Sequence, residues 1–176
     1  NATAINNAAV SNAGSSITLG QVTGSGSLSG SGTFSIGSLG TDFEFTNTLS
    51  GCGLKKVGSG TMTITKTQAV TADVTIEAGT LNLRTSTIED YPIFRASTSN
   101  TYGITIKSGA TLSGRANVGK LTVSGGTIAP GDTRIAVMQG YLLASEVNMN
   151  NSSSLNLCLV NAKNLDSSRS WLKVNG

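Results

Sequence analysis

The sequence predicts an all-β protein of the β-solenoid class, in which short strands stack on one another in successive coils. One short phrase recurs along the chain: a glycine, a threonine and then alternating apolar residues, as in residues 60–64 and again in residues 79–83. The composition agrees, since 22 of the 176 residues are glycine whereas only 12% are charged and 5% are aromatic. Glycine-rich turns between two-faced strands produce such a composition. Repetition of one strand-and-turn unit is the sequence signature of a stacked architecture.

The strands are expected at regular intervals, each with period-two alternation and each bounded by Gly, Asn or Ser. A first short strand covers residues 17–19, and the glycine-serine run of residues 24–30 is expected to form turns. The remaining strands are predicted at residues 33–36, 43–45, 54–57, 61–65, 74–76, 81–83, 104–106, 121–123, 147–149 and 155–159. One short helix is predicted near residues 141–147. About eight coils, stacked at roughly 4.8 Å each, would form a rod on the order of 40 Å long.

Residues 87–102 interrupt this pattern and are predicted to form a loop inserted between coils of a single domain that spans residues 1–176. The segment contains two of the three tyrosines, one of the four phenylalanines, one of the two prolines and two adjacent acids. Aromatic and charged side chains on a loop are typical of a ligand or partner patch. The candidate residues of this patch are Asp90, Tyr91, Phe94, Arg95 and Tyr102. A satellite hydrophobic cluster folded over the solenoid would have the same composition and is the alternative.

The charge and the cysteine content limit the partners and covalent links that we expect for this chain. The formal charge is +3, and apart from Lys55 and Lys56 the basic residues are scattered singly. A nucleic-acid surface needs clustered basic residues interleaved with aromatics, so we predict no nucleic-acid partner. Cys52 and Cys158 are expected to be free thiols, because residues so distant in a solenoid lie beyond the Cα separation that a disulfide tolerates.

Three further expectations concern membrane-spanning segments, processing of the chain and its two ends. No stretch approaches eighteen apolar residues, so no membrane-spanning helix is predicted. The chain begins at Asn1 without Met or a signal peptide, which we expect of a mature chain or of a segment excised from a longer solenoid. A β-helix also exposes strand edges at its termini, and apolar residues on both faces of the last strands indicate two-sided burial. A candidate end-to-end interface is therefore formed by Leu157, Cys158, Leu159 and Val160.

Residues that could carry catalysis are few. The chain has no histidine, which excludes Ser-His-Asp, Cys-His and zinc-dependent mechanisms in their usual forms. Two carboxylates are what a glycosidase needs, and the nearest pairs are Asp42 with Glu44 and Glu89 with Asp90. A solvated strand edge explains the first pair and a turn explains the second. We therefore predict no catalytic residues, no cofactor and no metal.

Threonine rows suggest a separate function, binding of an ice surface. Residues 61–67 would project four hydroxyls along one strand face. Such a surface needs the same pattern in register on successive coils, and Thr46, Thr48, Thr85 and Thr87 do not fall at a constant spacing. Threonine as an ordinary strand residue is the default interpretation.

Three phrases, in this order, resemble the autotransporter-associated β-helix repeat of bacterial surface proteins. Residues 54–64 are similar to its opening, L-x-K-x-G-x-G-T-L-T-L, and residues 74–83 to its close, T-x-V-x-A-G-T-L-x-L. Residues 125–132 are similar to G-G-T-L-x-P-G-N, and residues 154–159 with 174–176 to a polar-alternating strand followed by L-x-V-x-G. The resemblance covers the chain from about Gly51 to its end. It implies a right-handed parallel β-helix, exported and serving as a stalk or scaffold, and it carries over no catalytic residue.

The function predicted from these observations is a non-enzymatic, extracellular scaffold or adhesin-like segment of a bacterial surface or secreted protein. Its expected partners are further copies of itself or a longer chain, and host or matrix glycans and proteins. The first alternative is a fibre subunit that stacks end to end. The second is a β-helix that binds or cleaves polysaccharide.

Overall fold

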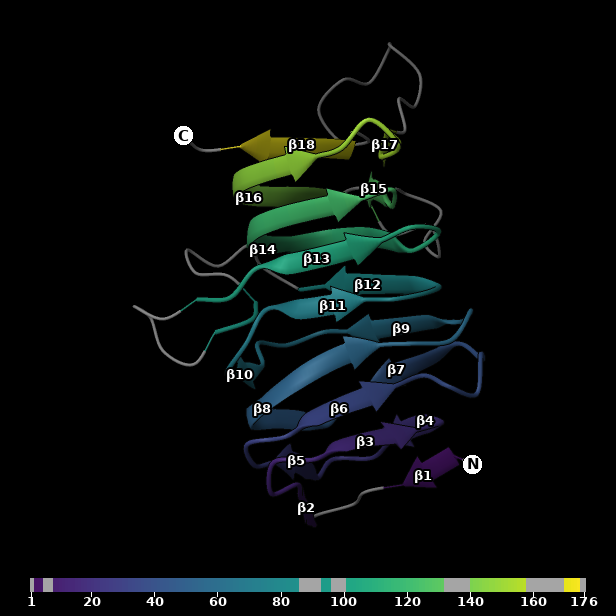
Figure 1. Cartoon of the computed structure of the whole chain (residues 1–176), viewed down its shortest axis with the longest axis vertical. Helices are drawn as coiled ribbons and strands as arrows, with labels where there is room; N and C mark the ends of the chain where they lie inside the picture. The colour runs from purple at the N-terminus through teal and green to yellow at the C-terminus, as the bar shows by residue number, and fades with distance from the viewer. Residues whose placement is uncertain are drawn as a thin grey trace.

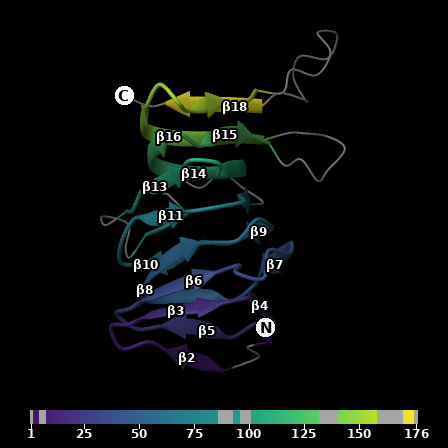
Figure 2. The same cartoon turned by 45° about the vertical axis from the view of Figure 1, so that its right-hand side comes forward.

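The computed structural model describes residues 2–4, 8–85, 93–95, 101–131, 140–157 and 170–174. Within these ranges the chain forms strands and turns and no helix, which confirms the all-β prediction for the described part. Figures 1 and 2 show the strands piled on one another, with β2 near one end of the pile and β18 at the other. This arrangement is consistent with a β-solenoid.

The strands are short and follow one another closely along the chain. In order they are β1 (Ala2–Ala4), β2 (Ala9–Ser11), β3 (Ser16–Leu19), β4 (Gln21–Thr23), β5 (Ser27–Ser29), β6 (Thr33–Ile36), β7 (Phe43–Phe45), β8 (Thr48–Lys56), β9 (Thr61–Ile64), β10 (Ala69–Val70), β11 (Val74–Ile76), β12 (Thr80–Arg84), β13 (Ile104–Lys107), β14 (Thr111–Ser124), β15 (Thr127–Pro130), β16 (Gly140–Met149), β17 (Ser154–Leu155) and β18 (Ser170–Val174). The predicted strands at 33–36, 43–45 and 74–76 have the predicted bounds. Those at 54–57 and 121–123 belong to the longer strands β8 and β14.

Pairings between these strands are parallel, and most of them fall into three stacks. Stack one contains β2, β5, the first half of β8 and β10. Stack two contains β3, β6, the second half of β8, β11, β13, the second half of β14 and β16. Stack three contains β7, β9, β12, the first half of β14, β15 and β17. Over much of its length the chain visits the stacks in turn, as winding in coils requires.

The core is a set of columns in which each inward residue lies on the equivalent residue of the next strand. In stack two one column runs Leu19, Ile36, Lys56, Ile76, Ile106, Val123, Met149. In stack three the column runs Phe43, Met62, Leu81, Leu112, Ile128, Leu155. The interior members of both columns are buried. Each strand therefore contributes one or two side chains to a continuous apolar interior.

Two local predictions are wrong. Residues 141–147 are not a helix but part of β16, where buried Leu142 and Ala144 alternate with half-buried Leu143 and exposed Ser145. Parallel partners β14 and β18 on either side impose this period of two. The run 24–30 contains a strand as well as turns, because Leu28 of β5 enters the core between β2 and β8.

Part of the predicted insertion 87–102 belongs to the stacked coils. Phe94 forms a parallel bridge to Gln68, whose backbone N–H donates to the Ile93 carbonyl at 2.9 Å. On the other side, the Ile93 N–H donates to the Asn117 carbonyl at 2.8 Å. Residues 93–95 thus lie between two neighbouring coils as a strand would, and residues 86–92 and 96–100 lie outside the described part.

Successive turns between stack two and stack three lie backbone against backbone. Gly58 and Gly79 both have positive φ, +72° and +64°, a region in which other residues are strained. A Cβ atom at Gly79 would overlap the carbonyl oxygen of Gly58, and one at Gly58 would overlap that of Gly37. Glycine is required here both by conformation and by the closeness of the next coil.

Gly79→Ala tests this constraint against Gly109→Ala, a matched control. Gly109 has a similar φ of +75°, but a Cβ there would meet nothing within 4 Å. We expect Gly109→Ala to lower the free energy of unfolding by about 1 kcal/mol, the cost of a left-handed residue. Gly79→Ala should cost about 3 kcal/mol or more, since the backbone must also move. Urea unfolding followed by circular dichroism measures both, and equal losses would contradict the close stacking.

Candidate functional site

The structure describes three residues of the predicted patch in 87–102, and it places them close together along the backbone. Phe94 is fully buried in the core, so its side chain offers no surface to a ligand. Tyr102 is half-buried against the core, and its N–H donates to the Phe94 carbonyl at 3.0 Å. Arg95 is half-buried, and its N–H donates to the Gln68 carbonyl at 3.1 Å. Asp90 and Tyr91 lie outside the described residues, and a binding role for the patch stays a prediction.

The predicted end-to-end interface is described at one residue, Leu157, which is 47% exposed. Cys158, Leu159 and Val160 lie outside the described residues. Cys52 is a free, buried thiol whose Sγ lies 3.7 Å from the Leu28 carbonyl oxygen. Burial raises the pKa of the Cys52 thiol, which makes it an unreactive core residue.

The outer face of stack two carries a row of threonines and charged side chains. Thr75, Thr105 and Thr122 lie in register along its middle, and all three are half-buried. Charged side chains flank this row. Lys55 pairs with Glu77 at 3.5 Å and Lys120 with Glu146 at 3.4 Å. The face therefore presents spaced hydroxyls between paired charges, a surface suited to hydrogen bonding with an extended polar partner.

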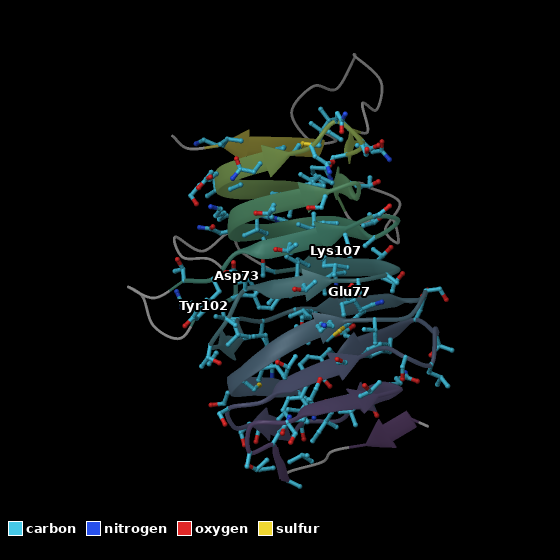
Figure 3. All side chains as sticks on the ribbon, in the orientation of Figure 1. Asp73, Glu77, Tyr102 and Lys107 are labelled. Atoms are coloured by element: carbon cyan, nitrogen blue, oxygen red, sulfur yellow. The ribbon has the colours of Figure 1, made fainter. Side chains whose placement is uncertain are left out.

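Figure 3 shows Asp73 and Tyr102 at the left margin of this face, where they precede β11 and β13, and Glu77 and Lys107 farther to the right, at the other ends of these strands. Asp73 accepts a hydrogen bond from the Gly103 N–H at 2.8 Å and so ties β11 to the turn before β13. The carboxylate of Glu146 accepts a hydrogen bond from Asn148 at 2.6 Å. This bond, with the nearby Lys120, holds the pKa of Glu146 below its usual range, so this carboxylate stays charged near neutral pH.

Threonines do align in register on stack three, contrary to the expectation from Thr46, Thr48, Thr85 and Thr87. The aligned residues are the first residues of β9, β12, β14, β15 and β17: Thr61, Thr80, Thr111, Thr127 and Ser154. The next outward row is buried, with Thr63 at 0% and Asn82 and Ser113 at 2% exposure. An open double row of hydroxyls, as ice binding would need, is therefore not present at these positions.

The candidate carboxylate pair is held by structural contacts. Asp42 Oδ1 accepts a hydrogen bond from the Thr61 N–H at 2.7 Å. Glu44 Oε2 lies 2.6 Å from Arg84 Nη2, and this ion pair joins β7 to β12 across the strand between them, β9. Asp42 therefore links neighbouring coils, and Glu44 links the two coils on either side of β9. Glu89 and Asp90 lie outside the described residues.

Other features of the described residues give no further site. No three His, Cys, Asp or Glu side chains among them gather closely enough to hold a metal ion. Nor does the described part contain a helix long and apolar enough to span a membrane. A shallow hollow of about 350 Å³ is open to solvent near the N-terminal end. Its lining is small and uncharged: Ala8, Ala9, Ser25, Gly26, Ser27 and Thr48.

Lys56 is a residue with an unusual setting that sequence reasoning missed. It is fully buried in the inward column of stack two, between Ile36 and Ile76. Its Nζ donates to the carbonyls of Val57 and Gly58 at 2.9 and 2.8 Å, and to that of Ala78 in the next turn at 3.1 Å. The three protons of the ammonium thus have three acceptors. The period of two along the strand could have identified it, because Lys56 lies two residues after the buried Leu54 and therefore on the same inward face.

Burial sets the protonation of this side chain. Desolvation lowers the pKa of Lys56 from 10.5 to about 8, and the negative charge of Asp42 acts in the opposite direction. Lys56 is therefore an ammonium at neutral pH and bridges two successive turns in that form. Its role in the described geometry is structural, because its donors are directed to backbone carbonyls.

None of three comparisons, with protein-family models, with curated proteins and with solved structures, finds a match to this chain.

Lys56→Met should change how stability depends on pH. Between pH 8 and 10.5 the unfolded chain still binds the proton that folded Lys56 has released, so the stability of the native protein rises with pH. Relative to Lys56→Met, we expect the free energy of unfolding to rise by up to about 3 kcal/mol across this window. Denaturant melts at several pH values measure it. Lys55→Met, a change at the half-buried neighbour on the outer face, is the control. Native and Lys56→Met curves that run parallel would contradict the prediction.

Proposed function

We propose that this chain is a non-enzymatic β-helix scaffold of a bacterial surface or secreted protein, with adhesion at its outer faces. The observation that carries the proposal is the uninterrupted register of stack two. Its inward column keeps one alignment from Leu19 to Met149 through seven strands. A core built this way grows along one axis and leaves side faces for contact, which suits a stalk or display segment.

The proposal includes the handedness of the helix and its number of coils. We infer a right-handed helix of about eight coils, because strand-to-strand connections of this kind are right-handed in nearly all proteins. The three phrases that resemble the autotransporter-associated repeat support the same architecture and an exported, extracellular location. Their glycines at 58 and 79 lie at stacked turns, where close packing requires glycine.

Adhesion is assigned to the outer face of stack two. The Thr75, Thr105 and Thr122 hydroxyls, spaced by about 4.8 Å as strands are, lie between the ion pairs Lys55–Glu77 and Lys120–Glu146. Hydroxyls and charges at regular spacing suit a glycan or the polar surface of a matrix protein. Exposed ion pairs of this kind add little to stability, so this face is free to serve recognition.

Protease treatment of intact native cells tests the location. We expect externally added protease to remove the chain, detected with an antibody to it, while a cytosolic protein in the same cells stays intact. Released culture protein should contain the chain if the parent is secreted. Protection of the chain until the cells are lysed, with none of it in the medium, would contradict the proposal.

Incubation with polysaccharides separates the scaffold from the cleaving alternative. We expect no release of reducing ends from a panel of acidic and neutral polysaccharides by the native protein. Asp42→Asn and Glu44→Gln provide the decisive comparison, because each removes a charge while keeping the shape of the side chain. Cleavage by the native protein that either substitution abolishes, with folding unchanged by circular dichroism, would overturn the scaffold assignment.

A further inference from the structure

Four polar side chains lie together on the outer face of stack two, on the neighbouring strands β13 and β14. Thr105 pairs in register with Thr122, and Lys107 pairs in register with Ser124. Lys107 and Ser124 are exposed, and both threonines are half-buried between buried apolar neighbours. We call these four residues the Lys107 quartet, and Figure 3 labels Lys107.

The polar groups of the Lys107 quartet have no partner within the part of the chain that the structure describes. The three hydroxyls form no hydrogen bond there, and the Lys107 ammonium forms no ion pair. Threonines elsewhere on the coils differ in this respect. Thr71 Oγ1 donates to the Gly51 carbonyl at 3.2 Å, and Thr85 Oγ1 donates to the Arg115 carbonyl at 2.9 Å. The quartet therefore has hydrogen-bonding capacity that the fold does not use.

The other charged side chains on this face already have partners. They are Lys55 with Glu77 at 3.5 Å, Lys120 with Glu146 at 3.4 Å, and Asp73, which accepts the Gly103 N–H at 2.8 Å. Among the described residues of the face, Lys107 is thus the one cation without an anionic partner. Charge complementarity favours an anionic group of a ligand at this position.

The neighbours of Lys107 set the side from which such a group would approach. Ile76 pairs with Ile106, so Glu77 lies beside Lys107 on the strand before it. Ser124 lies beside Lys107 on the strand after it. An anionic group would meet the ammonium on the Ser124 side, away from the Glu77 carboxylate.

The open shape of the face favours a polymer as the ligand. The quartet lies on the surface of a sheet, where a single contact with an exposed charge contributes little. A polymer with repeated groups makes several such contacts at once and gains from their effective concentration. Thr75 extends the hydroxyl row by one strand, which gives a chain lying along the stack a further contact.

The composition of the face favours an acidic polymer over a neutral one. Neutral sugar chains are commonly held by packing of their rings on aromatic side chains. The outward strand positions of stack two carry no aromatic residue in the part that the structure describes. Affinity at this face must therefore come from charge and hydrogen bonds.

We propose that the Lys107 quartet binds an acidic polysaccharide. A carboxylate or sulfate group of the polymer meets the Lys107 ammonium, and sugar hydroxyls bond to Thr105, Thr122 and Ser124. Each of these hydroxyls both donates and accepts, as sugar hydroxyls do. An acidic peptide would instead bring several carboxylates to one cation. This inference rests on the proposed adhesion at the outer face of stack two and names its ligand class.

Binding to immobilised polymers tests the ligand class. In surface plasmon resonance we expect the native protein to bind polygalacturonate, which carries carboxylates, or dextran sulfate, and to leave uncharged dextran unbound. Binding should weaken severalfold when the salt is raised from about 0.05 to about 0.5 M, because screening weakens exposed charge contacts. Binding to one acidic polymer alone supports the proposal and identifies the anionic group. No binding to either one, or equal binding to dextran, overturns it.

Substitutions within the quartet test the site. Lys107→Gln should weaken binding about fivefold, the upper value for one exposed charge contact, and Lys107→Arg should retain most of it. The double variant Thr105→Val with Thr122→Val keeps the shape of the strands and should also weaken binding. Circular dichroism verifies that each variant is folded.

Lys66→Gln and Thr80→Val are the matched controls. Lys66 is exposed after β9, and Thr80 is half-buried on β12, so both lie on stack three. Each makes the same chemical change as a quartet variant, away from the proposed site, and should bind as the native protein does. If Lys66→Gln weakens binding as much as Lys107→Gln, binding follows net charge alone and the proposal is overturned.

Poly-glutamate separates a glycan from an acidic protein as the ligand. We expect it to bind more weakly than the acidic polysaccharide, and the double threonine variant should lose this difference. Equal affinity for both polymers in the native protein would assign the face to an acidic protein and overturn the proposal. Protease treatment of cells measures location separately. A chain on the cell exterior that binds no acidic polysaccharide would remove this inference and leave the scaffold proposal intact.

Discussion

The structure depends on how closely one turn of the chain lies on the next. Parallel strands pair at about 4.8 Å, so the turns that connect them must stack at the same spacing. At the turn between stacks two and three, Gly37, Gly58 and Gly79 leave no room for a Cβ atom at the second and third of these positions. The turn carbonyls then need donors, and the buried ammonium of Lys56 supplies three of them. The close stacking of the turns and the burial of the Lys56 ammonium therefore depend on each other.

This constraint also decides where function can be located. An interior of stacked columns fills itself with side chains from each strand, so binding is left to the outer faces and the ends. The faces carry hydroxyl rows and surface ion pairs, as at Thr75, Thr105 and Thr122 with Lys55–Glu77 beside them. The ends carry half-exposed apolar residues such as Leu19 and Met149. The polar sides are the physical basis for the proposal that recognition takes place there.

The acids of this chain illustrate why a residue type does not by itself predict chemistry. Asp42 and Glu44 have the spacing of a paired-carboxylate site, but Asp42 accepts the Thr61 N–H and Glu44 pairs with Arg84. The first contact connects neighbouring coils, and the second connects β7 to β12 across β9. The aligned threonines give a similar lesson, because register places Thr61 beside Thr80 while the burial of Thr63 removes the second row from the surface.

The sequence by itself predicted the all-β class and many of the strands with their glycine turns, because a period of two and the recurring Gly-Thr phrase are local properties of the backbone; the short strands β2, β4, β5 and β10 were not predicted. It did not determine the strand at β16, where Leu, Ala and Glu favour a helix and neighbouring strands override that preference. Nor did it place Phe94 in the core or Lys56 between Ile36 and Ile76. Those placements depend on which residues of distant coils become neighbours. Register between coils is a long-range property, and only the tertiary structure decides it.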